Sequence, residues 1–348
     1  MRIGMIYDLR EQYLLQGFNL EQTAEFDSTA TVEAIERGIR DMGLVPERIG
    51  NLFEAMPALG QGRRWDLVFN IAEGLYGLSR ESQVPALLEA HRIPCTFSDA
   101  LVLAVCLHKG VTKRIIRDLG LPTPDFAVIQ DLAETEGLAL SFPLFAKPVA
   151  EGTSKGISQA SLIQDKNALE RTCADLLARF QQPVLVERYL PGREFTVGVV
   201  GTGPKARCLG AMEVLLLENA EQDVYSLSNK EEYEDRVRYQ LVDGVLSRKL
   251  AGLAVDLWRG LGARDAGRVD IRLDEHGRPQ ILEINPLPGL HPIRSDLSIL
   301  CRFQGITHGE LIRMIMESAL ERALTGHNAP YSPVASVHGT RHAAGLAA

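Results

Sequence analysis

One late stretch of this chain constrains its fold more than any other: two strand-like segments of alternating character that flank the turn-forming residue Gly277. Glycine accepts a positive φ, so the dipeptide that ends at this residue predicts a two-residue hairpin turn. Folding the hairpin there places Asp270 opposite Glu283. It also places Arg268 opposite Asn285. Side chains alternate across a strand, and these four are therefore predicted to project from one face of the hairpin.

The polar face of this predicted hairpin suits a hard metal ion. Two carboxylates and an amide oxygen form an oxygen-only site of the kind that Mg²⁺ prefers. A solvated hairpin also carries charges, but these charges interrupt strongly apolar strands, where an unpaired carboxylate is costly to bury. We therefore predict that Asp270, Glu283 and Asn285 ligate magnesium.

Composition excludes several classes of function. The chain has 348 residues, long enough for two or three packed units. Its formal net charge of −8 argues against a nucleic-acid-binding surface. No apolar run approaches the length of a membrane span, and the start of the chain lacks the long apolar stretch of a secretion signal. The five cysteines are scattered without metal-ligand spacing, which is typical of buried thiols in a reducing cytoplasm.

The first hundred residues alternate between predicted strands and helices, a pattern that favours a small parallel sheet. Strands are expected at Arg2–Tyr7, at Trp65–Ile71 and at Ile93–Phe97. Helices are expected at Thr31–Met42 and Gln83–His91. No Gly-x-Gly-x-x-Gly follows the first strand, so a dinucleotide site is not expected there.

The rest of the chain divides into a small α+β unit, a larger unit and a tail. Leu101–Leu119 is predicted as one helix that bears Lys109 and Lys113 on one face, and prolines stop it. A helix at Asn167–Phe180 and a strand at Pro183–Tyr189 follow. The predicted domains are an N-terminal α/β domain at 1–105, a central domain at 106–191, a metal-binding domain at 192–325 that ends in a helix, and a flexible tail at 326–348.

A nucleotide site is suggested by a lysine and a loop in the central unit. Lys147 ends a strand, and the following loop, 151–156, contains glycines and hydroxyl groups. Backbone N–H groups of such a loop approach phosphate oxygens closely, and the lysine adds positive charge. An ordinary hairpin turn is the alternative for the loop taken alone.

A second strand supplies groups for a purine. Glu187 can accept from an exocyclic amine, while backbone groups of Tyr189 and Leu190 can pair with the purine edge. Glu194 follows at a distance suited to ribose hydroxyls. The order of these groups, ahead of the acidic hairpin, favours nucleotide binding.

Three groups of residues together resemble the ATP-grasp enzymes of the D-alanine–D-alanine ligase group. They are Lys147…Glu151-Gly-Thr-Ser154, Glu187-Arg-Tyr-Leu…Glu194-Phe-Thr-Val and Arg268-Val-Asp270…Glu283-Ile-Asn285…Pro288-Gly289. The resemblance runs from about residue 65 to residue 322, with a weaker match in the first strand and helix. It implies a three-domain ATP-grasp fold of α/β and α+β type, with an N-terminal parallel-sheet domain and ATP between the second and third domains.

The resemblance implies a role for each matching residue. ATP contacts are expected from Lys109, Lys147, Glu151, Gly152, Thr153, Ser154, Glu187, Tyr189, Leu190, Glu194 and Lys230. Lys230 lies in a polar loop at 219–235, and a solvated loop charge is its alternative. Asp270, Glu283 and Asn285 are expected to ligate two Mg²⁺ ions, for which Mn²⁺ can substitute. The catalytic candidates are Arg268, Lys147 and Ser154.

The amino-acid pockets depart from the family pattern. Ligases that make D-alanyl-D-alanine usually carry Gly-Gly-x-Ser after the first strand, and this chain has Tyr7-Asp-Leu-Arg-Glu-Gln-Tyr13 there. Substrate contacts are expected from Gly289, Arg294, Ser295 and Asp296. The alternative for Arg294 and Asp296 is an ion pair within their own surface loop, which contributes little.

The implied function is an ATP-dependent carboxylate–amine ligase that joins amino-acid-like small molecules through an acyl phosphate and releases ADP and phosphate. A genuine D-alanine–D-alanine ligase of cell-wall synthesis and a non-catalytic nucleotide-binding module are the alternatives. We expect a cytoplasmic protein with no nucleic-acid or membrane partner, and the resemblance suggests a homodimer through the first domain.

Overall fold

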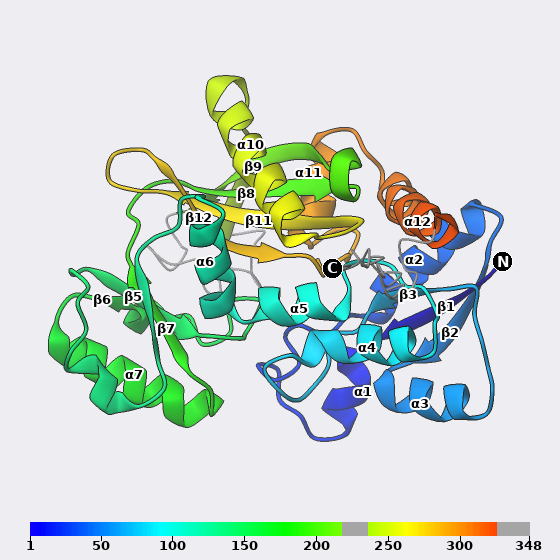
Figure 1. The fold of residues 1–348 in the computed structure, drawn as a ribbon, viewed down its shortest axis with the longest axis horizontal. Helices are drawn as coiled ribbons and strands as arrows, with labels where there is room; N and C mark the ends of the chain where they lie inside the picture. Colours follow the sequence, from blue (N-terminus) through cyan, green and yellow to red (C-terminus); the bar gives the residue numbers. More distant parts are fainter. Residues whose placement is uncertain (218–235, 326–348) are drawn as a thin grey trace, which may run out of the picture.

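The computed structural model describes residues 1–217 and 236–325, whose strands form three sheets (Figure 1). The polar loop at 219–235, which contains Lys230, lies outside the described residues, and so does the predicted tail at 326–348. None of the described helices is long and apolar enough to cross a membrane.

The first unit is built on a parallel sheet of order β2-β1-β3, which confirms the predicted parallel arrangement. Its elements are β1 (Arg2–Tyr7), α1 (Arg10–Leu15), α2 (Thr29–Asp41), β2 (Val45–Gly50), α3 (Leu52–Gly60), β3 (Leu67–Ile71) and α4 (Gln83–Ala90). The strand predicted at Ile93–Phe97 is wrong, because this segment makes only an isolated bridge from Cys95 to Val68. Asp265 of the third unit accepts from the Phe97 amide instead.

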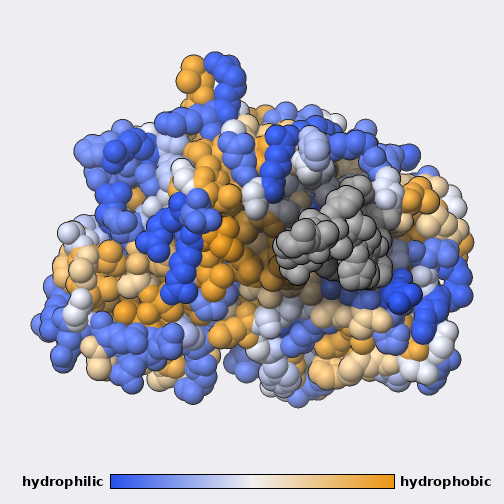
Figure 2. Space-filling view, in the orientation of Figure 1, coloured by the Kyte–Doolittle hydropathy of each residue, from blue (hydrophilic) through white to orange (hydrophobic). Residues whose placement is uncertain are grey.

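The second unit has an antiparallel sheet of order β4-β7-β5-β6. Its elements are α5 (Ala100–Leu107), α6 (Lys109–Asp118), β4 (Phe126–Ile129), β5 (Leu144–Pro148), β6 (Leu162–Ile163), α7 (Lys166–Phe180) and β7 (Val184–Arg188). Helix α5 is apolar on all sides, and Figure 2 shows hydrophobic side chains gathered between the units, where α5 and α6 run.

The single helix predicted at Leu101–Leu119 is wrong. The chain breaks at His108, whose ψ of 88° is not helical, and the His108 ring caps α6 by accepting from the Val111 amide. The break frees the amide of Lys109 to donate to the carbonyl of Val149, the residue that follows β5. Lys109 thereby begins α6 beside the loop that follows β5.

The third unit has an antiparallel sheet of order β10-β9-β8-β11-β12. Its elements are β8 (Glu194–Val200), β9 (Arg207–Leu216), β10 (Val237–Leu241), α10 (Gly244–Leu261), β11 (Ala266–Leu273), β12 (Pro279–Asn285), α11 (Asp296–Phe303) and α12 (His308–Leu324). The fully buried Trp258 of α10 packs into the apolar core on one face of this sheet.

The last helix returns to the first unit. Leu311, Ile315 and Met316 of α12 share a buried cluster with Ile35 and Ile39 of α2. Figure 1 shows α12 beside α2. The helix therefore packs on the first sheet, although the predicted division assigns it to residues 192–325.

Candidate active site

The β11–β12 hairpin has the predicted register at its polar end, with Asp270 opposite Glu283 and Arg268 opposite Asn285. The predicted two-residue turn is wrong: the Asp274 amide donates to the Arg278 carbonyl, which leaves three residues in the loop. A bulge restores the register, since Ile271 pairs with Ile281 while Asp270 pairs with Glu283. The extra residue is Leu282, and both it and Glu283 line a cavity.

The three predicted metal ligands lie together at the polar end of the hairpin. Asp270 accepts from the Thr196 hydroxyl at 2.9 Å and from the Asn285 amide at 3.0 Å. The described residues contain no group of three or more His, Cys, Asp or Glu placed to hold a metal. Two carboxylates and one amide are the only oxygen donors in the predicted set, and this chemistry fits Mg²⁺ with water or phosphate oxygens as further ligands.

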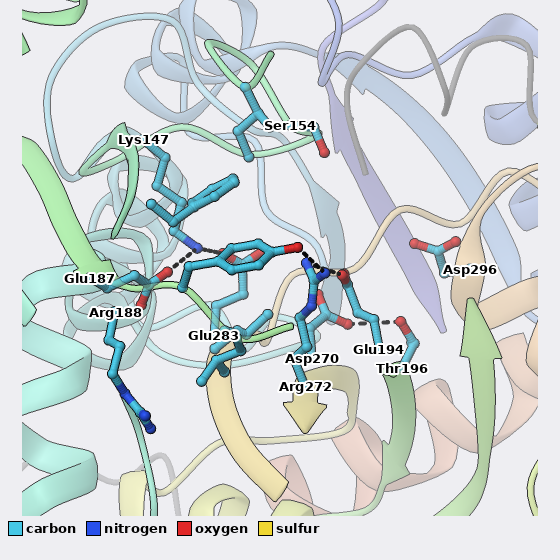
Figure 3. Close-up of a pocket in the computed structure, with 15 residues that line it drawn as sticks. Lys147, Ser154, Glu187, Arg188, Glu194, Thr196, Asp270, Arg272, Glu283 and Asp296 are labelled. Atoms are coloured by element: carbon cyan, nitrogen blue, oxygen red, sulfur yellow. Dashed lines mark hydrogen bonds and ion pairs between the residues drawn. The ribbon is translucent and has the colours of Figure 1, made fainter. Parts of the chain in front are cut away.

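A cavity opens in front of this hairpin (Figure 3). Strands of the second and third sheets and the loop after β5 surround it. Of the predicted site residues, the cavity is lined by Lys147, Ser154, Glu187, Tyr189, Leu190, Glu194, Asp270, Glu283 and Asp296. Residues far apart in the sequence thus converge on one cavity between the two sheets.

Three buried lysines and two glutamates form a charged network at one side of the cavity. Lys147 Nζ lies 3.3 Å from Glu187 and 3.4 Å from Glu283. Burial alone lowers the pKa of Lys147, but the two carboxylates outweigh burial and raise that pKa. Lys109 reaches Glu283 at 3.8 Å and donates to the Glu151 carbonyl at 2.5 Å. Lys147 therefore holds positive charge beside the predicted metal ligands, whereas burial lowers the pKa of Lys109.

Lys113 was not assigned to the site from the sequence, yet it holds the predicted adenine-binding carboxylate. Its fully buried ammonium lies 2.6 Å from Glu187 and donates to the Thr123 hydroxyl at 2.8 Å. Burial raises the pKa of Glu187, but Lys113 and Lys147 outweigh burial, so that the pKa is lowered and the group stays ionised. The i,i+4 spacing from Lys109 was the one available signal, because it places both lysines on one helix face.

The loop after β5 has two residues with positive φ, and side chains of the first unit hold its backbone. Thr153 and Ser154 both have positive φ, 48° and 58°, which is uncommon for residues with side chains. Glu25, from the first unit, accepts from the Gly152 amide at 2.6 Å and from Arg80 at 2.9 and 3.0 Å. Arg80 also donates to the Ala150 carbonyl at 2.7 Å.

Glu25 and Arg80 were missed in the sequence because they stand in irregular segments without periodic pattern. Burial raises the pKa of Glu25, but Arg80 and Lys155 outweigh burial and lower it to about 2. Lys155 bonds to both Glu25 at 3.2 Å and Glu151 at 2.5 Å. An ionised carboxylate from the first unit therefore holds the predicted phosphate loop of the second.

The predicted substrate loop is arranged differently from its surface ion-pair alternative. Asp296 does not pair with Arg294: its carboxylate accepts from Arg268 at 2.6 Å and from the Tyr239 hydroxyl at 3.2 Å. Arg294 is exposed and does not line the cavity. Ser295 accepts from the His291 amide and lies against Gly289, where an added Cβ would meet its hydroxyl oxygen at 2.9 Å.

The first-strand segment is occupied by contacts within its own unit. The Asp8 carboxylate accepts from the Tyr13 hydroxyl at 2.6 Å and from the Gly74 amide at 3.0 Å. Burial raises the pKa of Asp8. Glu11, the other acid of this segment, is exposed.

Known proteins resemble this chain in sequence over most of its length. The family model described as D-ala D-ala ligase C-terminus matches residues 115–317. The D-alanine–D-alanine ligase of Aquifex aeolicus is 30% identical over 292 residues, which cover 83% of this chain and 94% of that ligase. D-alanine–D-alanine ligase A of Escherichia coli K12 is 31% identical over 268 residues, which cover 74% of this chain and 70% of that ligase.

Solved structures share the fold. The D-alanine–D-alanine ligase of Bacillus anthracis matches with a TM-score of 0.72 at 22% identity, over 93% of this chain and 99% of that one. A structure of the same ligase complexed with ATP matches with a TM-score of 0.70 at 21% identity. Since the family model spans more than half of the sequence and relatives are 30% identical along most of it, this chain belongs to the D-alanine–D-alanine ligase-like family of ATP-grasp proteins.

Proposed function

We propose that this chain is an ATP-dependent carboxylate–amine ligase that uses Mg²⁺. One observation carries the proposal. Alternate residues on one face of β11 contact, one after another, residues with proposed roles in nucleoside, metal and substrate binding. Arg272 contacts Tyr189 and Glu194, Asp270 contacts Asn285, and Arg268 contacts Asp296. Nucleoside, phosphate and substrate groups can therefore lie in a row along one strand.

The proposal gives each part of the cavity a binding role. Lys109, Lys147 and the loop residues Glu151–Ser154 contact the phosphates, whereas Glu187 and the backbone of Tyr189 and Leu190 contact adenine and Glu194 contacts ribose. Asp270, Glu283 and Asn285 would hold Mg²⁺, which neutralises phosphate charge when bound. Lys109 and Lys147, which both lie beside Glu283, support these roles, because they place positive charge near the proposed metal and phosphate positions.

The chemistry is two displacements. A carboxylate oxygen of the acid attacks the γ-phosphorus, the bond from that phosphorus to the β,γ-bridging oxygen breaks, and ADP leaves. The amine nitrogen then attacks the acyl carbon, and phosphate leaves with the bonding pair while the nitrogen gives up a proton. No covalent enzyme intermediate is needed. Arg268 and Lys147 stabilise the developing negative charge, and Ser154 contributes a hydroxyl from the phosphate loop.

Product analysis tests this function directly. The enzyme is incubated with ATP, Mg²⁺ and a pool of D- and L-amino acids, and ADP release and product masses are measured. We expect ADP together with a condensed product whose mass is that of its two substrates less one water. ADP release that stays flat over the pool, with or without added simple amines, favours a non-catalytic nucleotide-binding module and contradicts the proposal.

A genuine D-alanine–D-alanine ligase is the second candidate, because relatives of this chain carry that name. D-alanine alone then supports fast ADP release and yields the dipeptide. The self-contained bonding of Asp8 weighs against it, because that carboxylate is committed to Tyr13 and Gly74. We also propose cytoplasmic location, small-molecule substrates, a homodimer through the first unit and use of Mn²⁺ in place of Mg²⁺.

A further inference from the structure

The connection between β7 and β8 carries several of the proposed nucleoside contacts. Strand β7 ends at Arg188, and β8 begins at Glu194, the proposed ribose ligand. Tyr189 and Leu190, whose backbone is proposed to contact adenine, lie between them and line the cavity. The connection passes from the second sheet to the third, so its attachment to both sheets determines where a nucleoside can lie.

The backbone of this connection is attached at both ends. The Tyr189 amide donates to the carbonyl of Pro143, which precedes β5, at 3.1 Å. The Gly192 amide donates to the Leu273 carbonyl at 3.0 Å, and the Leu273 amide donates to the Arg193 carbonyl at 2.9 Å. Gly192 lies so close to the end of β11 that an added Cβ would meet the Leu273 carbonyl oxygen at 2.5 Å. The connection therefore packs directly on β11.

Arg272 of β11 contacts the same connection through its side chain at three points. Its Nε donates to the Gly192 carbonyl at 3.1 Å, and one terminal nitrogen donates to the Tyr189 hydroxyl at 3.2 Å. The other terminal nitrogen lies 3.4 Å from the Glu194 carboxylate, and in Figure 3 the Arg272 and Glu194 side chains point toward each other. The guanidinium carbon lies 5.1 Å from the centre of the Tyr189 ring. A planar fork of donors suits such a three-point contact.

The pairing of Arg272 with Glu194 follows from the register of the sheet. The two residues lie directly opposite each other in β11 and β8, so that their side chains share a face and their opposite charges attract. Both side chains line the cavity and are mostly buried, at 15% and 21% exposed. A carboxylate offers about four lone-pair sites, and one N–H group uses only one of them. Arg272 therefore restricts the orientation of the Glu194 carboxylate and leaves it able to accept from ribose hydroxyls.

We propose that Arg272 is a positioning residue that holds Glu194 and Tyr189 in place for the nucleoside and thereby makes the site select ATP over nucleotides that lack a ribose hydroxyl. This inference rests on the nucleotide-binding part of the proposed function. A carboxylate held in one orientation is left without a donor when a deoxyribose binds, and such an unpaired polar group is costly. A carboxylate free to turn toward water loses less.

Binding measurements test the inference without an acid or an amine. Titration calorimetry in the presence of Mg²⁺ gives the Kd of ATP, of 2′-deoxy-ATP and of 3′-deoxy-ATP. We expect at least one deoxy analogue to bind at least about 10-fold more weakly than ATP, the effect of one hydrogen bond to a charged group. The ratio of the two Kd values is the quantity compared between variants.

Variants connect this ratio to Arg272. Arg272→Met removes the guanidinium and keeps an apolar stem, and the ratio should fall at least about 3-fold. Arg278→Met removes a cation of the same hairpin whose partner is Asp274, and it should leave the ratio unchanged. Loss of general stability would weaken ATP and its analogues alike, so it does not change the ratio.

A double-mutant cycle shows whether Arg272 acts through Glu194. Glu194→Ala should itself lower the ratio, and adding Arg272→Met should then change it by less than about 2-fold. An equal fall caused by Arg272→Met with and without Glu194 would overturn the positioning role.

The inference and the ligase function fail in distinguishable ways. Equal binding of ATP and both analogues in the wild type, or a ratio that survives in Arg272→Met, overturns the inference alone. Selective ATP binding that falls as expected in Arg272→Met, without any condensed product in the amino-acid screen, overturns the ligase function alone. The absence of nucleotide binding overturns both.

Discussion

Glu187 shows how neighbouring cations hold a buried carboxylate in one position. Its buried carboxylate lies 2.6 Å from Lys113 and 3.3 Å from Lys147. Lys113 is anchored in turn through Thr123, whose hydroxyl donates to the Ile281 carbonyl in β12. The position of Glu187 in the second sheet is therefore linked to the acidic hairpin of the third.

Replacing Lys113 should destabilise the protein strongly. Lys113→Met leaves a buried carboxylate with one cation fewer, and breaking such a pair costs about 3–5 kcal/mol. Urea unfolding should show this loss, whereas Arg114→Met, at an exposed neighbouring position, should change stability by less than about 0.5 kcal/mol. The double variant Lys113→Met with Glu187→Leu should recover part of the loss, and strictly additive effects would argue against the coupling.

Asp27 gives a pH dependence of stability with a definite sign. Burial raises its pKa to about 7, whereas the unfolded chain keeps the ordinary value near 4. The folded state therefore binds a proton that the unfolded state has released, and stability falls as pH rises from about 4 to 7.

Asp27→Asn should remove this contribution, since the amide keeps the size of the side chain without ionising. We expect Tm at pH 8 to rise by at least about 2 °C and the difference from wild type to disappear near pH 4. Thermal scans across this range measure it, and an unchanged Tm difference at all pH values would contradict the assigned pKa shift.

At the scale of elements, two side chains of the first unit hold the backbone of the proposed phosphate loop. Glu25 and Arg80 hold the backbone at Gly152 and Ala150. Arg80 has a side chain only 6% exposed, whereas Arg179, which also bridges the first and second units through Glu21, is 49% exposed. The two arginines differ mainly in burial and in contact with the loop.

Arg80→Met should therefore loosen the loop, and Arg179→Met should not. Hydrogen exchange of residues 150–156 should speed up in the first variant only. We expect kcat/KM for ATP to fall roughly 10- to 100-fold, because small misplacement of positioning groups is costly. Equal exchange rates in the two variants would show that Arg80 does not hold the loop.

Sequence patterns predicted elements better than their connections. Strand β1 and the helix at α2 follow from alternation and periodicity, and the structure confirms them. The structure confirms the predicted hairpin register although the predicted turn is wrong. The loop is one residue longer than predicted, and the bulge at Leu282 compensates for that extra residue. A bulge and the break at His108 have no local signal, since packing against other elements determines both.

The candidate site shows the same difference between residues that local pairing brings together and residues that only packing brings together. Asp270 and Glu283 belong to one hairpin, so local pairing brings them together. Glu25 and Arg80 reach the proposed phosphate loop only through the packing of the first unit on the second, which no sequence spacing predicts. The predicted domain boundaries stay predictions.

At the scale of the whole molecule, one buried carboxylate links segments that lie far apart in the sequence. Asp265 is fully buried and accepts from Arg322 of α12 at 2.6 Å and from the Phe97 amide at 2.7 Å. Ser318 donates to the same carboxylate at 2.7 Å. The third sheet, the last helix and the first unit therefore meet at one charged side chain.

Arg322→Met should weaken the whole molecule, because it leaves Asp265 charged and buried without its cation. A loss of about 3–5 kcal/mol is expected. Lys205→Met, which removes an exposed ion pair to Glu321 on the same helix, should cost less than about 1 kcal/mol. Calorimetry compares the two variants, and equal losses of stability would contradict the role of the Asp265–Arg322 contact.

The central claim is that the β11–β12 hairpin holds a magnesium–nucleotide complex. Titration calorimetry of ATP, with and without Mg²⁺, measures this directly in the wild type, in Asp270→Asn and in the loop control Glu275→Gln. We predict magnesium-linked ATP binding in the wild type and in Glu275→Gln, and its loss in Asp270→Asn. ATP binding that is absent from all three, or indifferent to both Mg²⁺ and Asp270, would contradict the account.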